Sequence, residues 1–79
     1  MSLLEKVIDI VATTLKVNKD EISKDSGLGT IAKWDSLNHT NLVLELEDAF
    51  DIGFDFDELD KIITVEKIVA SLEDKGVTI

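Results

Sequence analysis

The chain contains no cysteine, so neither a disulfide bond nor a zinc–thiolate site can stabilise its fold. With 79 residues it has the size of one small domain, and such a domain buries only about 60% of the surface that its unfolded chain exposes. Apolar packing must therefore supply most of the stability. Apolar side chains make up 44% of the residues and proline is absent, which is typical of a globular helical protein. We expect one domain over residues 1–79.

Apolar side chains recur at helical spacing in several segments of the chain. Ser2, Asp35 and Thr64 precede three of these segments and are suitable N-caps. Asn18 and Gly76 are suitable ends for the first and the last. The predicted helices span about residues 3–16, 35–51, 55–61 and 64–76, and a long, partly packed loop covers residues 17–34. The predicted fold is all-α: a small bundle of three main helices plus one short helix, with no strands.

Charge is distributed unevenly along the chain. Asp and Glu number 17 against 8 lysines, a net charge of −9, and residues 34–60 contain nine acids and no lysine or arginine. Phosphate contacts to nucleic acid need clustered Lys and Arg, and anionic membranes would repel this segment. No apolar run has the length of a membrane span, and charges within residues 1–15 argue against a signal peptide. We expect neither nucleic-acid binding nor membrane insertion, but a partner with a basic patch.

The second predicted helix has two distinct faces. At about 100° per residue, the core stripe consists of Leu42, Leu46, Ala49 and Phe50. Leu37 lies about 140° from Leu42, and Leu44 falls almost in line with Leu37. Single exposed apolar residues are normal on any protein, but two aligned leucines framed by acids favour a docking surface. The residues of this predicted surface are Leu37, Asn41, Leu44 and Asp48, with Glu45 and Glu47 on its flanks.

Ser36 follows the predicted cap Asp35, and the single histidine, His39, follows three residues later. A hydrolase triad is not supported, because no orienting carboxylate or oxyanion hole is evident beside this pair. The spacing instead makes Trp34 and His39 the two positions of a hydrophobic staple. We therefore expect both to pack, and we expect no enzymatic activity. The three phenylalanines, Phe50, Phe54 and Phe56, are expected in the core.

The acids after the second helix do not form a calcium loop. An EF-hand needs oxygen ligands at loop positions 1, 3, 5 and 12 and glycine at position 6. Starting at Asp48 places Gly53 correctly but puts Phe50, Ile52 and Leu59 at ligand positions. We predict no metal site formed by this chain alone.

Three segments together resemble an acyl carrier protein: Asp35-Ser36-Leu37, Leu46-Glu47-Asp48-Ala49-Phe50 and Lys61-Ile62-Ile63-Thr64-Val65. The similarity spans nearly the whole chain and is densest over residues 34–72. It implies that Ser36 carries a 4′-phosphopantetheine arm through a phosphodiester, and that the thiol of the arm holds cargo as a thioester. The absence of cysteine fits this role, because the prosthetic group supplies the thiol. The resemblance also implies that Asp35 helps to hold a metal ion in the complex with the phosphopantetheinyl transferase.

The same resemblance concerns partners. In this family the helix after the serine docks onto partner enzymes, and its contact positions match Leu37, Leu44, Glu47 and Asp48. These agree with the outward face described above. The implied partners are the transferase and enzymes with basic patches that load and transfer acyl groups. We expect a monomer in the cytoplasm, a reducing compartment that the lack of cysteine suits.

Some positions depart from the pattern of primary fatty-acid carriers. Where this chain has Lys33 and Trp34, those carriers usually have glycine and a small residue. Where it has Thr40 and Asn41, they usually have a small apolar residue and glutamate. The W-D-S-L-x-H form is similar to stand-alone carriers of specialised pathways. The pathway stays open between fatty-acid-like and specialised synthesis, and aminoacyl cargo is an alternative to acyl cargo. A second class of function is an acidic helical interaction domain that is never modified.

Overall fold

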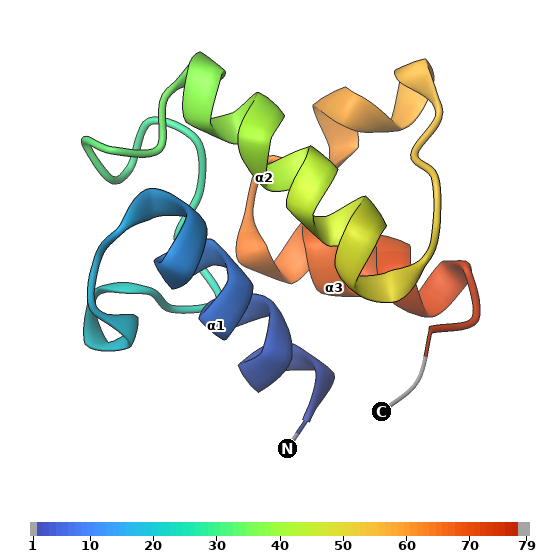
Figure 1. The fold of residues 1–79 in the computed structure, drawn as a ribbon, viewed down its shortest axis with the longest axis horizontal. Coiled ribbons are helices and arrows are strands. Elements are labelled where there is room, and N and C mark those ends of the chain that lie inside the picture. Colours follow the sequence, from blue (N-terminus) through green and yellow to red (C-terminus); the bar gives the residue numbers. More distant parts are fainter. Residues whose placement is uncertain (1, 78–79) are drawn as a thin grey trace.

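The computed structural model describes residues 2–77 of the chain. Three α-helices surround one apolar core, α1 (Leu3–Leu15), α2 (Ser36–Phe50) and α3 (Val65–Asp74), joined by two 3₁₀ helices, η1 (Lys19–Glu21) and η2 (Phe56–Lys61). Figure 1 shows α1 against both α2 and α3, whereas η2 packs on α3. Residues 2–77 contain isolated bridges but no β-strand. The all-α prediction is confirmed.

Each α-helix begins at the capping residue that the sequence predicts. Ser2 forms a capping box with Glu5, and the Thr64 hydroxyl accepts the Lys67 backbone N–H at 3.2 Å. These bonds satisfy N–H groups that have no partner within the helix. α1 ends at Leu15, one residue before the predicted end, because Lys16 adopts a left-handed conformation with φ 60°, and Asn18 instead precedes η1 as its N-cap.

Core side chains come from one face of each α-helix. Those of α1 and α3 follow the predicted spacing, but the buried stripe of α2 includes Val43 and not Ala49. His39 and Phe50 are half-buried on the same side of the helix as Val43. The centre of the buried stripe therefore lies closer to Val43 than the sequence predicts. Ala49 falls at its solvent edge and lines a surface hollow with Lys6 and Phe50. The buried apolar residues are Val7, Val11, Ala12, Leu15, Ile22, Trp34, Leu42, Val43, Leu46, Ile62, Val65, Ile68 and Leu72.

The prediction of a phenylalanine core is wrong at one position. Phe50 and Phe54 pack against the core, but Phe56 is 87% exposed. Phe56 is the first residue of η2, and the apolar contacts of this segment come from Leu59 and the buried Ile62. The spacing of aromatic residues does not reveal where a short helix turns toward the core.

The loop between α1 and α2 is held to the start of α3 by backbone hydrogen bonds. The Leu28 N–H donates to the Ile63 carbonyl at 2.8 Å, and the Val65 N–H donates to the Ser26 carbonyl at 2.9 Å. Between these bonds Gly27 is buried against the chain at Ile63 and Thr64. A Cβ on Gly27 would collide with the Ile63 carbonyl oxygen and lie 2.8 Å from the Thr64 methyl carbon. The backbone at Gly27 lies so close to the backbone at Ile63 and Thr64 that only glycine fits.

We expect Gly27→Ala to lower the free energy of unfolding by about 1–3 kcal/mol, because the loop must move away from α3 to admit the methyl group. Urea denaturation followed by the fluorescence of Trp34, the single tryptophan, measures this change. Gly53→Ala is the matched control, since the nearest atom to its added Cβ is 4.0 Å away. Equal effects of the two substitutions would contradict the close approach at Gly27.

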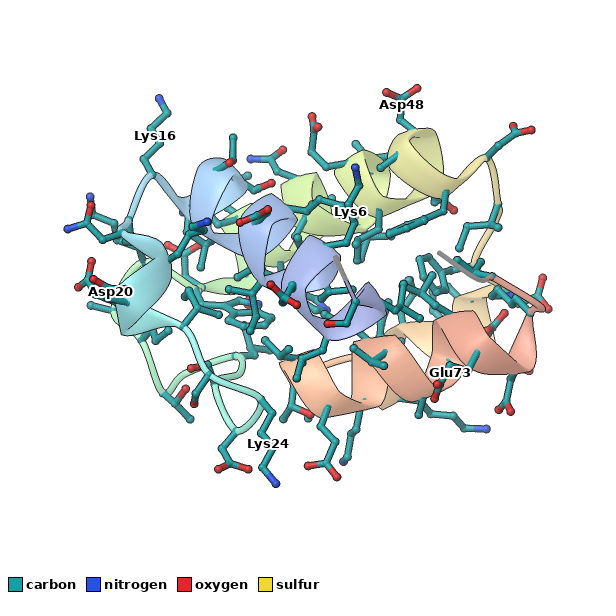
Figure 2. The ribbon with its side chains drawn as sticks, turned by 90° about the horizontal axis from the view of Figure 1, so that it is seen from below. Lys6, Lys16, Asp20, Lys24, Asp48 and Glu73 are labelled. Carbon is teal, nitrogen blue, oxygen red and sulfur yellow. The ribbon has the colours of Figure 1, made fainter. Side chains whose placement is uncertain are left out.

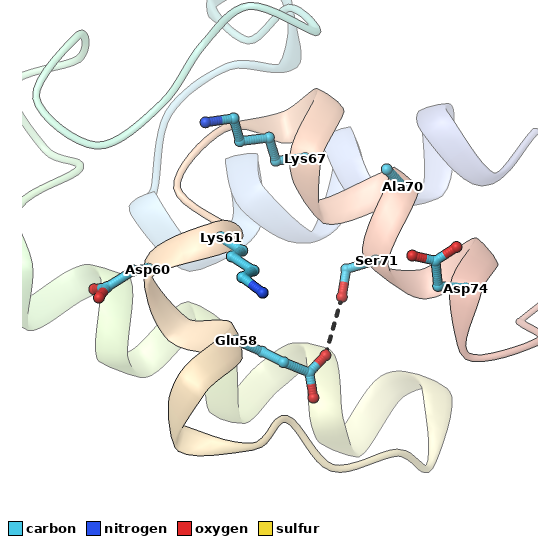
Figure 3. Close-up of a pocket in the computed structure, with 7 residues that line it drawn as sticks. All are labelled: Glu58, Asp60, Lys61, Lys67, Ala70, Ser71 and Asp74. Atoms are coloured by element: carbon cyan, nitrogen blue, oxygen red, sulfur yellow. Dashed lines mark hydrogen bonds between the residues drawn. The ribbon is translucent and has the colours of Figure 1, made fainter.

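A polar cluster ties η2 to the end of α3. The Glu58 carboxylate accepts bonds from Lys75 Nζ at 2.8 Å and from the Ser71 hydroxyl at 3.3 Å, and Lys75 Nζ lies 5.3 Å from the centre of the Phe54 ring. Figure 3 shows Glu58 and Ser71 facing each other across a surface hollow between the two elements. The hydrogen bond from Lys75 is the main reason why the pKa of Glu58 is lowered.

Because the folded state lowers the pKa of Glu58, its stabilising contribution is present above the ordinary value of 4.5 and is lost as pH falls through the folded-state pKa. The difference in unfolding free energy between the native chain and Glu58→Gln should therefore be constant from pH 5 to 7 and shrink below about pH 4.5. Urea titrations across this range measure it. Glu73→Gln, at an exposed position of α3 (Figure 2), is the control. A difference that does not change with pH would refute the role of the Glu58 charge.

Candidate functional site

Ser36 is the first residue of α2, and its side chain is exposed. The cap before it, Asp35, accepts the Asn38 backbone N–H at 2.8 Å through its carboxylate. The Ser36 hydroxyl is therefore not the capping acceptor, and it makes no hydrogen bond within residues 2–77. Its backbone carbonyl accepts the Thr40 hydroxyl at 3.1 Å. The structure thus presents a free hydroxyl on a fixed backbone.

Several features of the start of α2 favour an attached anion at Ser36, whereas the adjacent Asp35 carboxylate opposes it. The first turn of α2 contains no acid, whereas α1 and α3 carry Glu5 and Glu66 there. The N–H groups of Ser36 and Leu37 belong to the first turn, where no helix carbonyl can accept them. The positive end of the helix dipole adds to this setting. The residues present fit a phosphodiester on the Ser36 oxygen.

Asn38 supports the same turn from both sides of the cap, and sequence reasoning did not single it out. Its side-chain amide donates to the Lys33 carbonyl at 2.7 Å, while its backbone N–H donates to Asp35. An asparagine at the third helical position is the only sequence signal for this bridge, and it is a weak one. The consequence is that residues 33–38 form one hydrogen-bonded unit around Ser36.

Trp34 and His39 form the predicted staple, with a hydrogen bond in addition. Trp34 is fully buried, its Nε1–H donates to His39 Nδ1 at 2.9 Å, and the two rings stack with centroids 6.1 Å apart. Burial lowers the pKa of His39, while the Leu59 carbonyl acts in the opposite direction without reaching Nε2 at hydrogen-bond geometry. His39 Nδ1 is occupied and Nε2 is buried, so neither nitrogen can take a proton from Ser36. This geometry does not support a serine–histidine nucleophile.

The outward face of α2 is exposed as predicted. Leu37 is 73% and Leu44 is 59% exposed, and Asn41, Glu45 and Asp48 are exposed as well. Figure 2 shows the Asp48 side chain pointing away from the body of the protein. We refer to Leu37, Asn41, Leu44 and Asp48 as the α2 outer face. Two uncovered leucines beside acids form an apolar strip with an acidic border.

Glu47 differs from the other predicted docking residues. It is half-buried, and its carboxylate accepts the Phe54 backbone N–H at 2.9 Å. This bond closes the turn that leads from Asp51, the left-handed C-cap of α2, toward η2. Glu47 therefore lies at the edge of the exposed face, in keeping with its predicted place on the flank, and its carboxylate also has an internal structural partner.

Comparison with known proteins identifies the family. The family model described as "Phosphopantetheine attachment site" matches residues 5–72. The acyl carrier protein of Petrotoga mobilis is 37% identical over 92% of this chain and 86% of its own length. That of Chlorobium phaeobacteroides is 37% identical over 82% and 83%, and that of Syntrophus aciditrophicus is 32% identical over 99% and 98%. The chain therefore belongs to the acyl carrier protein family, whose members carry 4′-phosphopantetheine and act as carriers rather than as enzymes.

Proposed function

We propose that Ser36 is the attachment residue and that this protein carries acyl intermediates as thioesters on the arm attached there. The observation that supports the proposal is the free, exposed Ser36 hydroxyl at the first position of α2, within the segment that the family model matches. The thiol must come from the arm, since the chain has no cysteine. The arm supplies a flexible tether and the thioester chemistry, whereas the chain supplies the attachment point and the surface that partners recognise.

Asp35 has two roles in this proposal. Its Oδ1 atom caps α2 through the Asn38 N–H. The rest of its carboxylate faces solvent beside Ser36 and is available to a metal ion in the transferase complex. Residues 2–77 contain no group of three or more potential metal ligands. The remaining ligands would therefore come from the transferase and from coenzyme A.

The first test is modification of Ser36. Incubation with coenzyme A, Mg²⁺ and a promiscuous phosphopantetheinyl transferase should add the mass of one arm, and Ser36→Ala should abolish the addition while leaving the thermal melt nearly unchanged. Intact-mass spectrometry with peptide mapping measures both. A mass gain that persists in Ser36→Ala would overturn the assignment. No gain in the native chain would favour an unmodified interaction domain.

The two roles of Asp35 can be separated by substitution. Asparagine is as good an N-cap as aspartate but a weaker ligand for Mg²⁺, so Asp35→Asn should slow modification with little loss of stability. Asp35→Ala should also lose about 1 kcal/mol of stability with the cap. Transfer rates and urea melts of both variants measure this. Normal modification of Asp35→Asn would remove the metal role and leave the cap.

We further propose that the α2 outer face docks the enzymes that act on the arm, with Glu45 and Glu47 at its border. A partner that fits it has an apolar recess for Leu37 and Leu44, surrounded by lysine and arginine. The charge pattern supports this, because residues 34–60 contain nine acids and no lysine or arginine. Charge contacts of this kind accelerate encounter more than they prolong the complex, which suits a carrier that must leave each enzyme. We propose a cytoplasmic monomer, and a pathway that is either fatty-acid-like or specialised.

Charge reversal tests the docking surface. Asp48→Lys and Glu45→Lys should lower kcat/KM for phosphopantetheine transfer several-fold and flatten its dependence on salt, with stability changed by less than about 0.5 kcal/mol. Leu37→Ala should lower kcat/KM without changing the salt slope, because the lost contact is apolar. Glu47→Lys should also destabilise the protein, since the Phe54 N–H loses its acceptor. Unchanged rates and salt slopes in the Asp48 and Glu45 variants would mean that partners dock elsewhere.

A further inference from the structure

The indole of Trp34 links the loop before Ser36 to the first turns of α2. Its Nε1–H donates to His39 Nδ1 at 2.9 Å, and the ring planes are inclined by only 27°. Trp34 stands two residues before Ser36 and His39 three residues after it. The hydrogen bond therefore spans the attachment residue and closes a loop of chain around it.

The backbone of Trp34 is held on the other side by the loop. Its N–H donates to the Ile31 carbonyl at 2.9 Å, and its carbonyl accepts the Gly29 N–H at 3.1 Å. Ser36 itself is exposed, and no described residue holds its hydroxyl. The place of this hydroxyl is therefore set by the Ser36 backbone at the start of α2, and by how firmly the contacts of neighbouring residues hold that first turn.

Histidine at position 39 stabilises the core less than an apolar residue of similar size would. Its Nε2 atom is buried and has no hydrogen-bond partner among residues 2–77. An unsatisfied buried polar group destabilises a fold, and leucine would fill a similar volume without that loss. Burial lowers the pKa of His39 and so favours the neutral imidazole, whose Nδ1 can accept the indole N–H. What histidine supplies here, and leucine would not, is the acceptor for the Trp34 indole N–H.

We propose that Trp34 and His39 are positioning residues, whose hydrogen bond fixes the Asp35-Ser36 turn relative to the α2 outer face. A partner enzyme seated on that face then meets the Ser36 hydroxyl at a constant place. Misplacement of a reacting atom by about 1 Å can slow a reaction by about 100-fold, even when the surface that binds the partner is intact. The inference rests on the proposed attachment at Ser36 and on docking at the α2 outer face. It assigns the pair an effect on kcat rather than on binding.

The experiment uses variants that keep or remove this single bond. Trp34→Phe removes the donor and keeps a ring, and His39→Leu removes the acceptor and keeps the volume. His39→Asn retains an acceptor oxygen close to the position of Nδ1 and serves as the rescue variant. Ile68→Val, in the core on α3, is the control for general loss of stability. Each is assayed for kcat and KM of transfer from coenzyme A by a promiscuous phosphopantetheinyl transferase, well below its melting temperature.

We expect kcat to fall about ten-fold or more in Trp34→Phe and His39→Leu, with KM within about two-fold of the native value. His39→Asn should recover most of kcat, and Ile68→Val should retain it. Because the chain has one tryptophan, its indole N–H gives one proton resonance, which should shift in His39→Leu and stay near the native position in His39→Asn. The variant that combines Trp34→Phe and His39→Leu should have a kcat no lower than that of the slower single variant, since each substitution removes the same hydrogen bond.

The proposal is overturned if folded Trp34→Phe keeps native kcat, or if the loss of kcat in every variant, Ile68→Val included, follows its loss of stability. Should His39→Leu not fold, Trp34→Phe and His39→Asn decide the matter by the same criteria. A native chain that is never modified would refute the attachment at Ser36, and that result differs from one in which the native chain is modified and the variants match it.

Discussion

The burial of Trp34 is the constraint on which the rest of the structure depends. It is the largest fully buried side chain, in a core that is otherwise made of aliphatic residues from short helices. Removing an aromatic ring from water stabilises a small domain strongly, but a buried indole N–H needs an acceptor. The acceptor is His39 Nδ1, on the side of α2 that faces the core. The helix buries Leu42, Val43 and Leu46 and leaves its opposite face open to solvent.

The same burial orders a segment that has little regular structure. Residues 16–35 contain only one 3₁₀ turn, yet they are joined to α3 through Leu28 and Val65 and to α2 through Trp34. Asp35 and Ser36 lie at the end of this braced segment, on the surface. The loop thus holds the backbone just before Asp35 and Ser36 and leaves both side chains exposed. This arrangement suits the proposed attachment at Ser36 and gives the long loop a structural role.

Residues 34–60 contribute both charge and core packing, but through different side chains. The segment 34–60 has no lysine or arginine and is the source of the net charge, and mutual repulsion of its acids opposes folding. Three of these acids have partners within the protein: Asp35 accepts the Asn38 N–H, Glu47 accepts the Phe54 N–H, and Glu58 is paired with Lys75. Asp48 and Glu45 remain exposed, where their field extends into solvent. The fold thus tolerates its acidic segment by giving some carboxylates local partners and directing others outward.

The sequence by itself determined the helices, their N-caps and the outer face of α2. Capping and the three-to-four-residue spacing are local properties, so Asp35, Leu37 and Leu44 were assigned correctly without coordinates. Only the tertiary structure decided that Val43 replaces Ala49 in the core, that Phe56 is exposed and that Glu47 closes a turn. It also brought together Glu58 and Lys75, which are 17 residues apart. Local periodicity specifies which face of a helix is apolar, but which elements lie opposite that face, and how closely, depends on packing between distant segments.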